Sequence, residues 1–327
     1  MIRINISYID RYKIKAIFDN YIEKMDIVSK SNVLIEELNK SKYTNVAKLL
    51  SEYIIDNKLF YIFGKKELYI FAQKFDNAVS ADCKKNSEDK KQIISVVRNG
   101  RKAGGKGKRK KVYGFDDFYD WYSKSDEAYE ILNILNVNVC PYCNRQYTFS
   151  ARKGELKSRP QFDHFFPKSI YPFLSISLYN LIPSCALCNS GKSDGSPLDL
   201  LYPYEESFES HNIYFSIDEI VPYLLKFEKN IKISLESSNS DDEKIINSYY
   251  SNYKIKLLYE GHSDYIKEII EKKCIFNNDA LESICKSYPD GIIPSWYLEH
   301  LIFGKYEIDD YIHHPLSKFT SDIFKQL

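Results

Sequence analysis

Four of the seven cysteines fall into two Cys-x-x-Cys pairs, Cys140/Cys143 and Cys185/Cys188. Two such pairs can surround one Zn²⁺ ion tetrahedrally, because each short spacing lets both sulfurs of a pair point at the same ion. A closed site of four thiolates leaves no open coordination position, which indicates a structural zinc rather than a catalytic one. Four unrelated buried thiols are the weaker interpretation, since both pairs have the spacing of a zinc-binding turn.

A second group of polar residues lies between these pairs and just after them. Asp163 and His164 end the segment QFDH, which can form a short strand that brings both side chains to one site. A neutral imidazole can take a proton from water, and a carboxylate can hold a hard divalent cation against a phosphate. Hydrolysis of a phosphodiester needs both functions. An isolated Asp-His dipeptide is more often a surface turn or a satisfied core histidine. The catalytic interpretation of this dipeptide therefore depends on the flanking cysteines and on Asn180 and Asn189 downstream.

The order of these motifs resembles that of the HNH (ββα-metal, or His-Me finger) endonucleases, specifically their zinc-containing members. The resemblance runs from the first cysteine pair to Lys192, through CPYCNRQYTF, QFDHFFPKS, YNLIPSC and CALCNSGKSD. It implies that His164 is the general base and that Asp163 and Asn189 hold one catalytic Mg²⁺ or Mn²⁺ ion. It further implies that Asn180 braces the loop and orients the histidine, and that Lys192 lies near the phosphate.

One position departs from the family pattern. Asn189 stands where many members of the family have a histidine. Its neutral carbonyl oxygen suits magnesium or manganese better than a soft metal, so the change favours a hard cation at the catalytic site. If Asn189 points elsewhere, Asp163, water molecules and the substrate phosphate would hold the cation, which hard cations tolerate.

A looser resemblance extends beyond this segment. The stretches LYPYEESF from Leu201 and HHPLSKFTSDI from His313 are similar to segments that follow the HNH core in prokaryotic anti-phage nucleases, particularly the HNH component of Septu-type systems. That resemblance implies a defence complex with a partner ATPase. His313 and His314 are not assigned to a site, because adjacent histidines at a turn more often bind no metal. The remaining isolated histidines are interpreted as structural: His211, His262 and His300.

A strongly basic stretch precedes the motif. The segment 98–111, RNGRKAGGKGKRKK, contains four glycines and eight positive residues and no acidic one, which predicts a loop or linker. Two interpretations stay open, a solvated linker between domains and a surface that contacts nucleic-acid phosphates, and the nuclease motif favours the second. The candidate nucleic-acid-binding residues, besides Lys192, are Arg101, Lys102, Lys106, Lys108, Arg109, Lys110 and Lys111.

The spacing of apolar residues predicts an α+β fold that is mainly α-helical. Helices are expected over 9–75, 115–135, 245–259, 265–273, 280–288 and 297–303, strands over 214–220 and 231–235, and an exposed turn over 236–243. The expected organisation is a small zinc-containing ββα-metal core between helical regions. Its parts are a helical region (1–97), the basic segment (98–114), the nuclease core (115–200) and a mostly helical region (201–327).

Composition limits the remaining possibilities. The 327 residues carry a net charge of +1, so affinity for a polyanion must come from a local basic surface. The sequence lacks a long apolar stretch and a secretory signal, which predicts a cytoplasmic protein that does not enter membranes. The sequence therefore favours a metal-dependent endonuclease, acting on DNA by family likeness. The alternative is a zinc-containing module that binds nucleic acid or a partner without catalysis, and His164 distinguishes the two, because only catalysis needs its proton acceptor.

Overall fold

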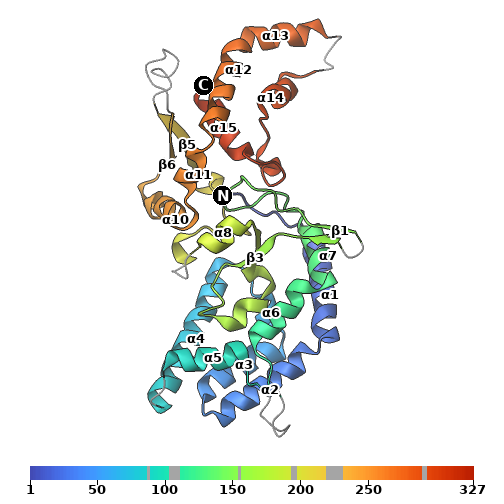
Figure 1. Cartoon of the computed structure of the whole chain (residues 1–327), viewed down its shortest axis with the longest axis vertical. Coiled ribbons are helices and arrows are strands. Elements are labelled where there is room, and N and C mark those ends of the chain that lie inside the picture. The colour runs from blue at the N-terminus through green and yellow to red at the C-terminus, as the bar shows by residue number, and fades with distance from the viewer. Residues whose placement is uncertain (87–88, 103–110, 154–155, 193–196, 219–230, 289–292) are drawn as a thin grey trace.

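The computed structural model describes residues 1–86, 89–102, 111–153, 156–192, 197–218, 231–288 and 293–327. These residues form mostly helices together with small antiparallel sheets, so the expected α+β, mainly helical class is confirmed. The molecule is elongated, with the N-terminal helices at one end and helices α12 to α15 at the other (Figure 1). Strand β3 and helix α8 lie between the two ends.

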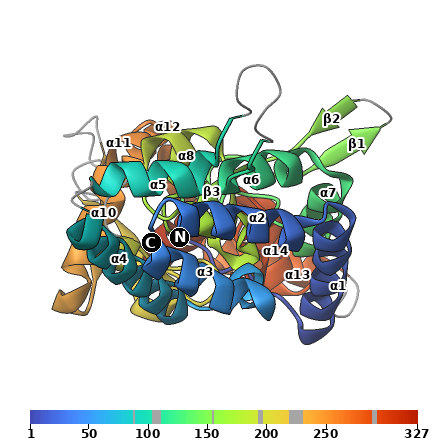
Figure 2. The ribbon, with the colours of Figure 1, turned by 90° about the horizontal axis from the view of Figure 1, so that it is seen from below.

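Several separate helices occupy the N-terminal part of the chain, where helical spacing predicted them over 9–75. Apolar side chains recur at helical spacing on the first helix, where Ile14, Phe18 and Tyr21 are buried in the core. The helices pack together at the end of the molecule seen in Figure 2. They are α1 (Tyr8–Lys24), α2 (Ile27–Lys40), α3 (Thr44–Ile55), α4 (Lys65–Asn86) and α5 (Lys90–Asn99).

The single helix expected over 115–135 is wrong in one respect, because two helices cover this range. Helix α6 (Phe115–Lys124) ends at Ser125, where the backbone is extended, and α7 (Asp126–Leu135) begins directly after it. The hydroxyl of Ser125 accepts a hydrogen bond from the backbone N–H of Ala128, which makes Ser125 the N-cap of α7. The apolar spacing continues across this break, so periodicity alone does not detect it.

The central part of the chain contains two hairpins and a short helix. Strands β1 (Ala151–Lys153) and β2 (Leu156–Ser158) pair with each other. Strand β3 (Gln161–His164) pairs antiparallel with β4 (Leu181–Ser184), and helix α8 (Ala186–Gly191) follows β4 directly. Between β3 and β4 the chain forms two 3₁₀ turns, η3 (Pro172–Ile176) and η4 (Leu178–Asn180).

The C-terminal region begins with a third hairpin, formed by β5 (Ile213–Asp218) and β6 (Lys232–Ser237). The strand expected over 214–220 is confirmed as far as residue 218, and its last two positions lie outside the described residues. Glu236 and Ser237 belong to β6 rather than to the expected turn, because pairing with β5 continues to Ser237. The helices are α10 (Glu243–Tyr253), α11 (Ile255–Glu260), α12 (Ser263–Ile275), α13 (Asn278–Ser287), α14 (Ser295–Phe303) and α15 (Ser317–Gln326).

The helix expected over 245–259 is also interrupted. Lys254 has a positive φ of 53°, and its backbone N–H bonds to the carbonyl of Tyr249, which ends α10 before α11 begins. Helix α15 was not expected from the sequence. It packs along β5, where Asp322 accepts a hydrogen bond from the backbone N–H of Phe215.

One continuous core of buried apolar residues joins the N-terminal helices, the central hairpin and the C-terminal sheet. The first residues of the chain run through its middle, where the backbone N–H of Ile2 bonds to the carbonyl of Pro141 at 2.8 Å. The N-terminus accordingly lies close to α8 (Figure 1). Within the described part of the chain, no helix is both long and apolar enough to cross a bilayer.

Candidate functional site

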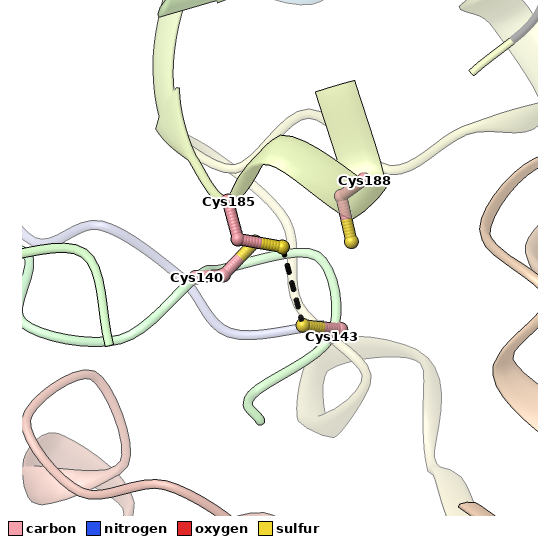
Figure 3. Close-up of side chains that lie close together, drawn as sticks. All are labelled: Cys140, Cys143, Cys185 and Cys188. Carbon is pink, nitrogen blue, oxygen red and sulfur yellow. Dashed lines mark hydrogen bonds between the residues drawn. The ribbon is translucent and has the colours of Figure 1, made fainter. Parts of the chain in front are cut away.

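The four paired cysteines meet in the interior. Cys140 and Cys143 face Cys185 and Cys188 (Figure 3), and all four side chains are buried. Their sulfur atoms lie within 4.8 Å of one another, with 3.9 Å between those of Cys143 and Cys185. A tetrahedral zinc with Zn–S bonds of about 2.3 Å separates its sulfurs by about 3.8 Å, so the cluster fits one zinc ion.

Local backbone structure aims these sulfurs. The first pair lies in a turn after α7, in which the backbone N–H of Asn144 bonds to the carbonyl of Cys140 at 2.8 Å. The second pair lies at the start of α8, where Cys185 is the N-cap residue and its carbonyl accepts from Asn189 at 3.0 Å. Burial raises the pKa of the Cys140 thiol well above its usual value, so a bound cation would have to stabilise the thiolate form.

Asp163 lies in β3 and is 4% exposed. Its Oδ2 accepts hydrogen bonds from the Tyr142 hydroxyl at 2.6 Å and from Lys192 Nζ at 2.8 Å. Lys192 Nζ also donates to the carbonyls of His164 and Phe165, at 2.7 and 2.9 Å. Three protein oxygens therefore surround the Lys192 ammonium, and they hold it against the end of β3.

The orientation of His164 defines its tautomer. Its Nε2 lies 3.1 Å from the carbonyl oxygen of Ser175, which can only accept, so Nε2 must carry the proton. In the neutral ring Nδ1 is then the proton acceptor. Burial, with Lys168 as the next contribution, lowers the pKa of His164 to about 3 and keeps the ring neutral. The ring of Tyr119 packs against it edge-on, with 4.6 Å between the centroids.

Asn180 is completely buried and ties together the loop between β3 and η3. Its Oδ1 accepts from the backbone N–H of Phe166 at 2.8 Å, and its Nδ2 donates to the carbonyls of Phe166 and Leu174, both at 3.0 Å. Leu174 precedes Ser175, whose carbonyl accepts from His164. Asn180 thus contacts the loop directly and the histidine only through the neighbouring backbone.

A pocket of about 230 Å³ gathers most of the expected site residues. Asp163, His164, Asn189 and Lys192 all line it. The Nδ2 of Asn189 donates to Gln161 Oε1 at 2.7 Å, which leaves its carbonyl oxygen as the group that can bind a cation. Asn180 does not line this pocket. The pocket thus combines a carboxylate and an amide oxygen, which are donors suited to a hard divalent cation, with a neutral imidazole that can accept a proton.

Two cationic residues at the pocket were missed by the sequence reasoning. Arg98 and Lys168 also line it, and both contact Asp116, with Nε of Arg98 at 2.6 Å and Nζ of Lys168 at 3.6 Å. Their side chains stay 39% and 28% exposed, so they can still meet an anion. Each stood in a segment already singled out, Arg98 at the start of the basic stretch and Lys168 in QFDHFFPKS, but spacing gave no sign that they meet.

The basic segment is described only at its ends. Lys106, Lys108, Arg109 and Lys110 lie outside the described residues. Of the others, Arg101 forms an ion pair with Glu37, and Lys111 Nζ lies 2.9 Å from Asp117, while Lys102 is exposed. Acidic neighbours therefore offset part of the charge that was expected to face nucleic acid.

The remaining histidines do not form a second cluster. In the described residues, the four cysteines are the one group of three or more potential His, Cys, Asp or Glu ligands. His262 accepts from Arg145 at 2.8 Å, and His314 stacks on Tyr306 with 3.7 Å between the centroids. These contacts explain both side chains without a metal.

Comparison with known proteins gives local similarities only. No family model matches this chain, and no solved structure matches it. A 79-residue stretch is 30% identical to Septu protein PtuB of Bacillus thuringiensis and covers 24% of this chain and 28% of that protein. A 64-residue stretch is 31% identical to protein ea31 of Escherichia phage lambda and covers 20% of this chain and 18% of that protein. The chain thus matches less than a third of either relative.

Proposed function

We propose that this protein is a metal-dependent endonuclease of the HNH type that hydrolyses phosphodiester bonds of DNA. The observation that carries the proposal is the neutral imidazole of His164, whose Nδ1 is a proton acceptor, beside the carboxylate of Asp163 in one pocket. The order of β3, β4 and α8 supports it, because it is the strand-strand-helix order that the sequence resemblance implies for a ββα-metal core.

His164 supplies the base in this proposal. Its Nδ1 takes a proton from the attacking water, and the hydrogen bond from Nε2 to the Ser175 carbonyl keeps the ring in the required tautomer. The low pKa keeps the ring unprotonated in the free protein. An anionic phosphate bound in the pocket would raise that pKa and so stabilise the imidazolium that forms during the reaction.

Asp163 and Asn189 are the residues that would hold the cation. Both line the pocket, and both offer the oxygen donors that magnesium and manganese prefer. Such an ion would offset negative charge on the phosphate and on the leaving oxygen. Arg98 and Lys168 would bind the neighbouring phosphates, since their cationic ends are partly exposed at the same pocket.

The biological setting proposed is anti-phage defence in the cytoplasm, together with a partner ATPase. The local similarity to Septu protein PtuB supports this setting. Co-expression with a candidate ATPase partner, followed by affinity purification of either protein, tests the partnership. Recovery of each protein alone, from cells that contain both, would contradict it.

One observation favours a second candidate, a binding module without catalysis. The Lys192 ammonium already lies 2.8 Å from Asp163, and both side chains are almost completely buried. A lysine in this place neutralises the carboxylate and competes with a metal cation for it. In that function the zinc cluster would organise a surface for nucleic acid or a partner, and His164 would be dispensable.

Cleavage assays with matched variants separate these functions. Wild-type protein, His164→Ala and the control His300→Gln, all with equal zinc content, are incubated with plasmid and linear DNA in Mg²⁺ or Mn²⁺. We expect cutting by the wild type and the control, and at least a 100-fold loss in His164→Ala, the usual scale for a general base. Equal cutting by His164→Ala would overturn the proposal. Binding of DNA without cutting by any of the proteins, even with the partner ATPase present, would favour the second candidate.

A further inference from the structure

We propose that Tyr142 is a positioning residue that connects the four-cysteine cluster to Asp163 and thereby sets the affinity of the pocket for a divalent cation. The inference rests on the proposed function. Tyr142 lies inside the first cysteine pair, between Cys140 and Cys143. Its hydroxyl donates to Asp163 Oδ2 at 2.6 Å, across 21 positions of sequence.

Each donor to this oxygen lies in or close after one of the two cysteine turns. Tyr142 belongs to the first turn. Lys192 follows the second one, and its backbone N–H bonds to the carbonyl of Cys188 at 3.2 Å. The two turns therefore hold the same oxygen, Asp163 Oδ2, from two sides. Among the described residues, no side-chain hydrogen bond or ion pair reaches Asp163 Oδ1, so this is the oxygen available to a cation in the pocket.

The position of Tyr142 is itself well defined. Its ring is completely buried and stacks on the ring of Tyr253, with 4.7 Å between the centroids and 18° between the planes. The turn that carries it is bonded from outside, because the Tyr259 hydroxyl donates to the carbonyl of Cys143 at 2.7 Å. A tyrosine fixed in this way restricts the rotation of the carboxylate it contacts, which orients Oδ1 before a cation arrives.

The conservative change Tyr142→Phe removes the hydroxyl and keeps the ring. Loss of a hydrogen-bonding partner behind a metal ligand commonly weakens metal binding by about 10- to 100-fold. Because Lys192 still holds Asp163 Oδ2 in this variant, we expect a loss near the lower limit, about 10-fold in Mn²⁺ affinity. The zinc content should stay at that of the wild type, since every cysteine remains.

The test measures Mn²⁺ binding to the full-length, zinc-loaded protein without DNA, from the electron paramagnetic resonance signal of free Mn²⁺. Tyr253→Phe is the matched control. It belongs to the same ring stack, and its buried hydroxyl has no hydrogen-bond partner among the described residues. Asp163→Asn reports whether the measured ion binds in the pocket at all. We expect weaker binding in Tyr142→Phe and Asp163→Asn, and wild-type binding in Tyr253→Phe.

The other outcomes separate the inference from the proposed function. Wild-type affinity in Tyr142→Phe, together with weakened binding in Asp163→Asn, would overturn the inference and leave the proposed site intact. Equal losses in Tyr142→Phe and Tyr253→Phe would also overturn it, because ring packing would then be responsible. Loss of zinc from Tyr142→Phe would place its role in the cysteine cluster instead and overturn the inference. Binding that does not depend on Asp163 would overturn both the inference and the proposed metal site.

Discussion

Replacing Asn180 by alanine should loosen the loop between β3 and η3. The substitution removes three hydrogen bonds from a fully buried side chain to backbone groups, one from the N–H of Phe166 and two to the carbonyls of Phe166 and Leu174. At about 1 kcal/mol for each bond, the loop loses about 3 kcal/mol of local stability. That free energy corresponds to an increase on the order of 100-fold in the fraction of time the loop is open.

Native-state hydrogen exchange measures this opening directly. We expect the amide of Phe166, which loses its acceptor, and its neighbours through residue 177 to exchange on the order of 100-fold faster in Asn180→Ala. The matched control is Gln326→Ala. That side chain also makes one accepted and two donated bonds to backbone groups, but at the junction of α15 and β5.

The control should therefore speed exchange near residues 215–217 and leave 165–177 unchanged. If Asn180→Ala accelerated exchange over 165–177 no more than Gln326→Ala does, the reasoning that the Asn180 amide holds this loop would be refuted. The position of the His164 ring would then have to depend on other contacts, such as the Ser175 hydroxyl, which donates to the carbonyl of Phe115 at 3.0 Å.

Three further predictions follow from other contacts. Metal analysis should find one zinc per chain in the wild type. Cys188→Ser should lose zinc and unfold at a lower temperature, because it removes one of the four clustered thiols. Cys274→Ser should keep its zinc, since this side chain is exposed and outside the cluster. Burial lowers the pKa of His262, so as the pH falls this imidazole binds a proton at a higher pH in the unfolded chain than in the folded one. The free energy of unfolding should therefore fall as the pH drops below about 6.5. His262→Gln should show a smaller fall in urea midpoint between pH 7.5 and 5.5 than the wild type. Arg98→Ala should weaken binding to all DNA sequences and lower the slope of log affinity against log salt by about one, whereas Lys40→Ala, on an exposed helix surface, should change neither.

Local patterns predicted the parts of this protein that local physics determines. The two cysteine pairs were expected to meet because one ion can bind both, and their sulfurs do gather in the interior. Helical spacing identified the N-terminal helices, since a buried stripe must recur every three or four residues. The short strand that ends at Asp163 and His164 was likewise readable from its own residues.

Contacts between distant segments were not readable in this way. Nothing in the spacing of Tyr142 or Lys192 indicates that both meet one oxygen of Asp163, because that contact depends on how two turns and a strand pack. The family resemblance implied that Lys192 lies near the phosphate; in the structure its side chain lines the pocket, and its ammonium contacts three protein oxygens. The breaks at Ser125 and Lys254 were missed for another reason. Apolar spacing continues through both, and only the cap hydrogen bonds reveal where each helix stops.

The cysteine cluster also has a consequence for how the chain can vary in length. With a zinc ion bound, the cluster would join both ends of the segment 144–184, so that the segment would form a closed loop with its base fixed in the core. The β1–β2 hairpin leaves this loop as an arm (Figure 1), and its strands pair only with each other. Lengthening such a loop costs little entropy, about 0.6 kcal/mol for each doubling. Insertions between β1 and β2 should therefore be tolerated, which makes this arm a suitable place for a fluorescent label or an epitope tag.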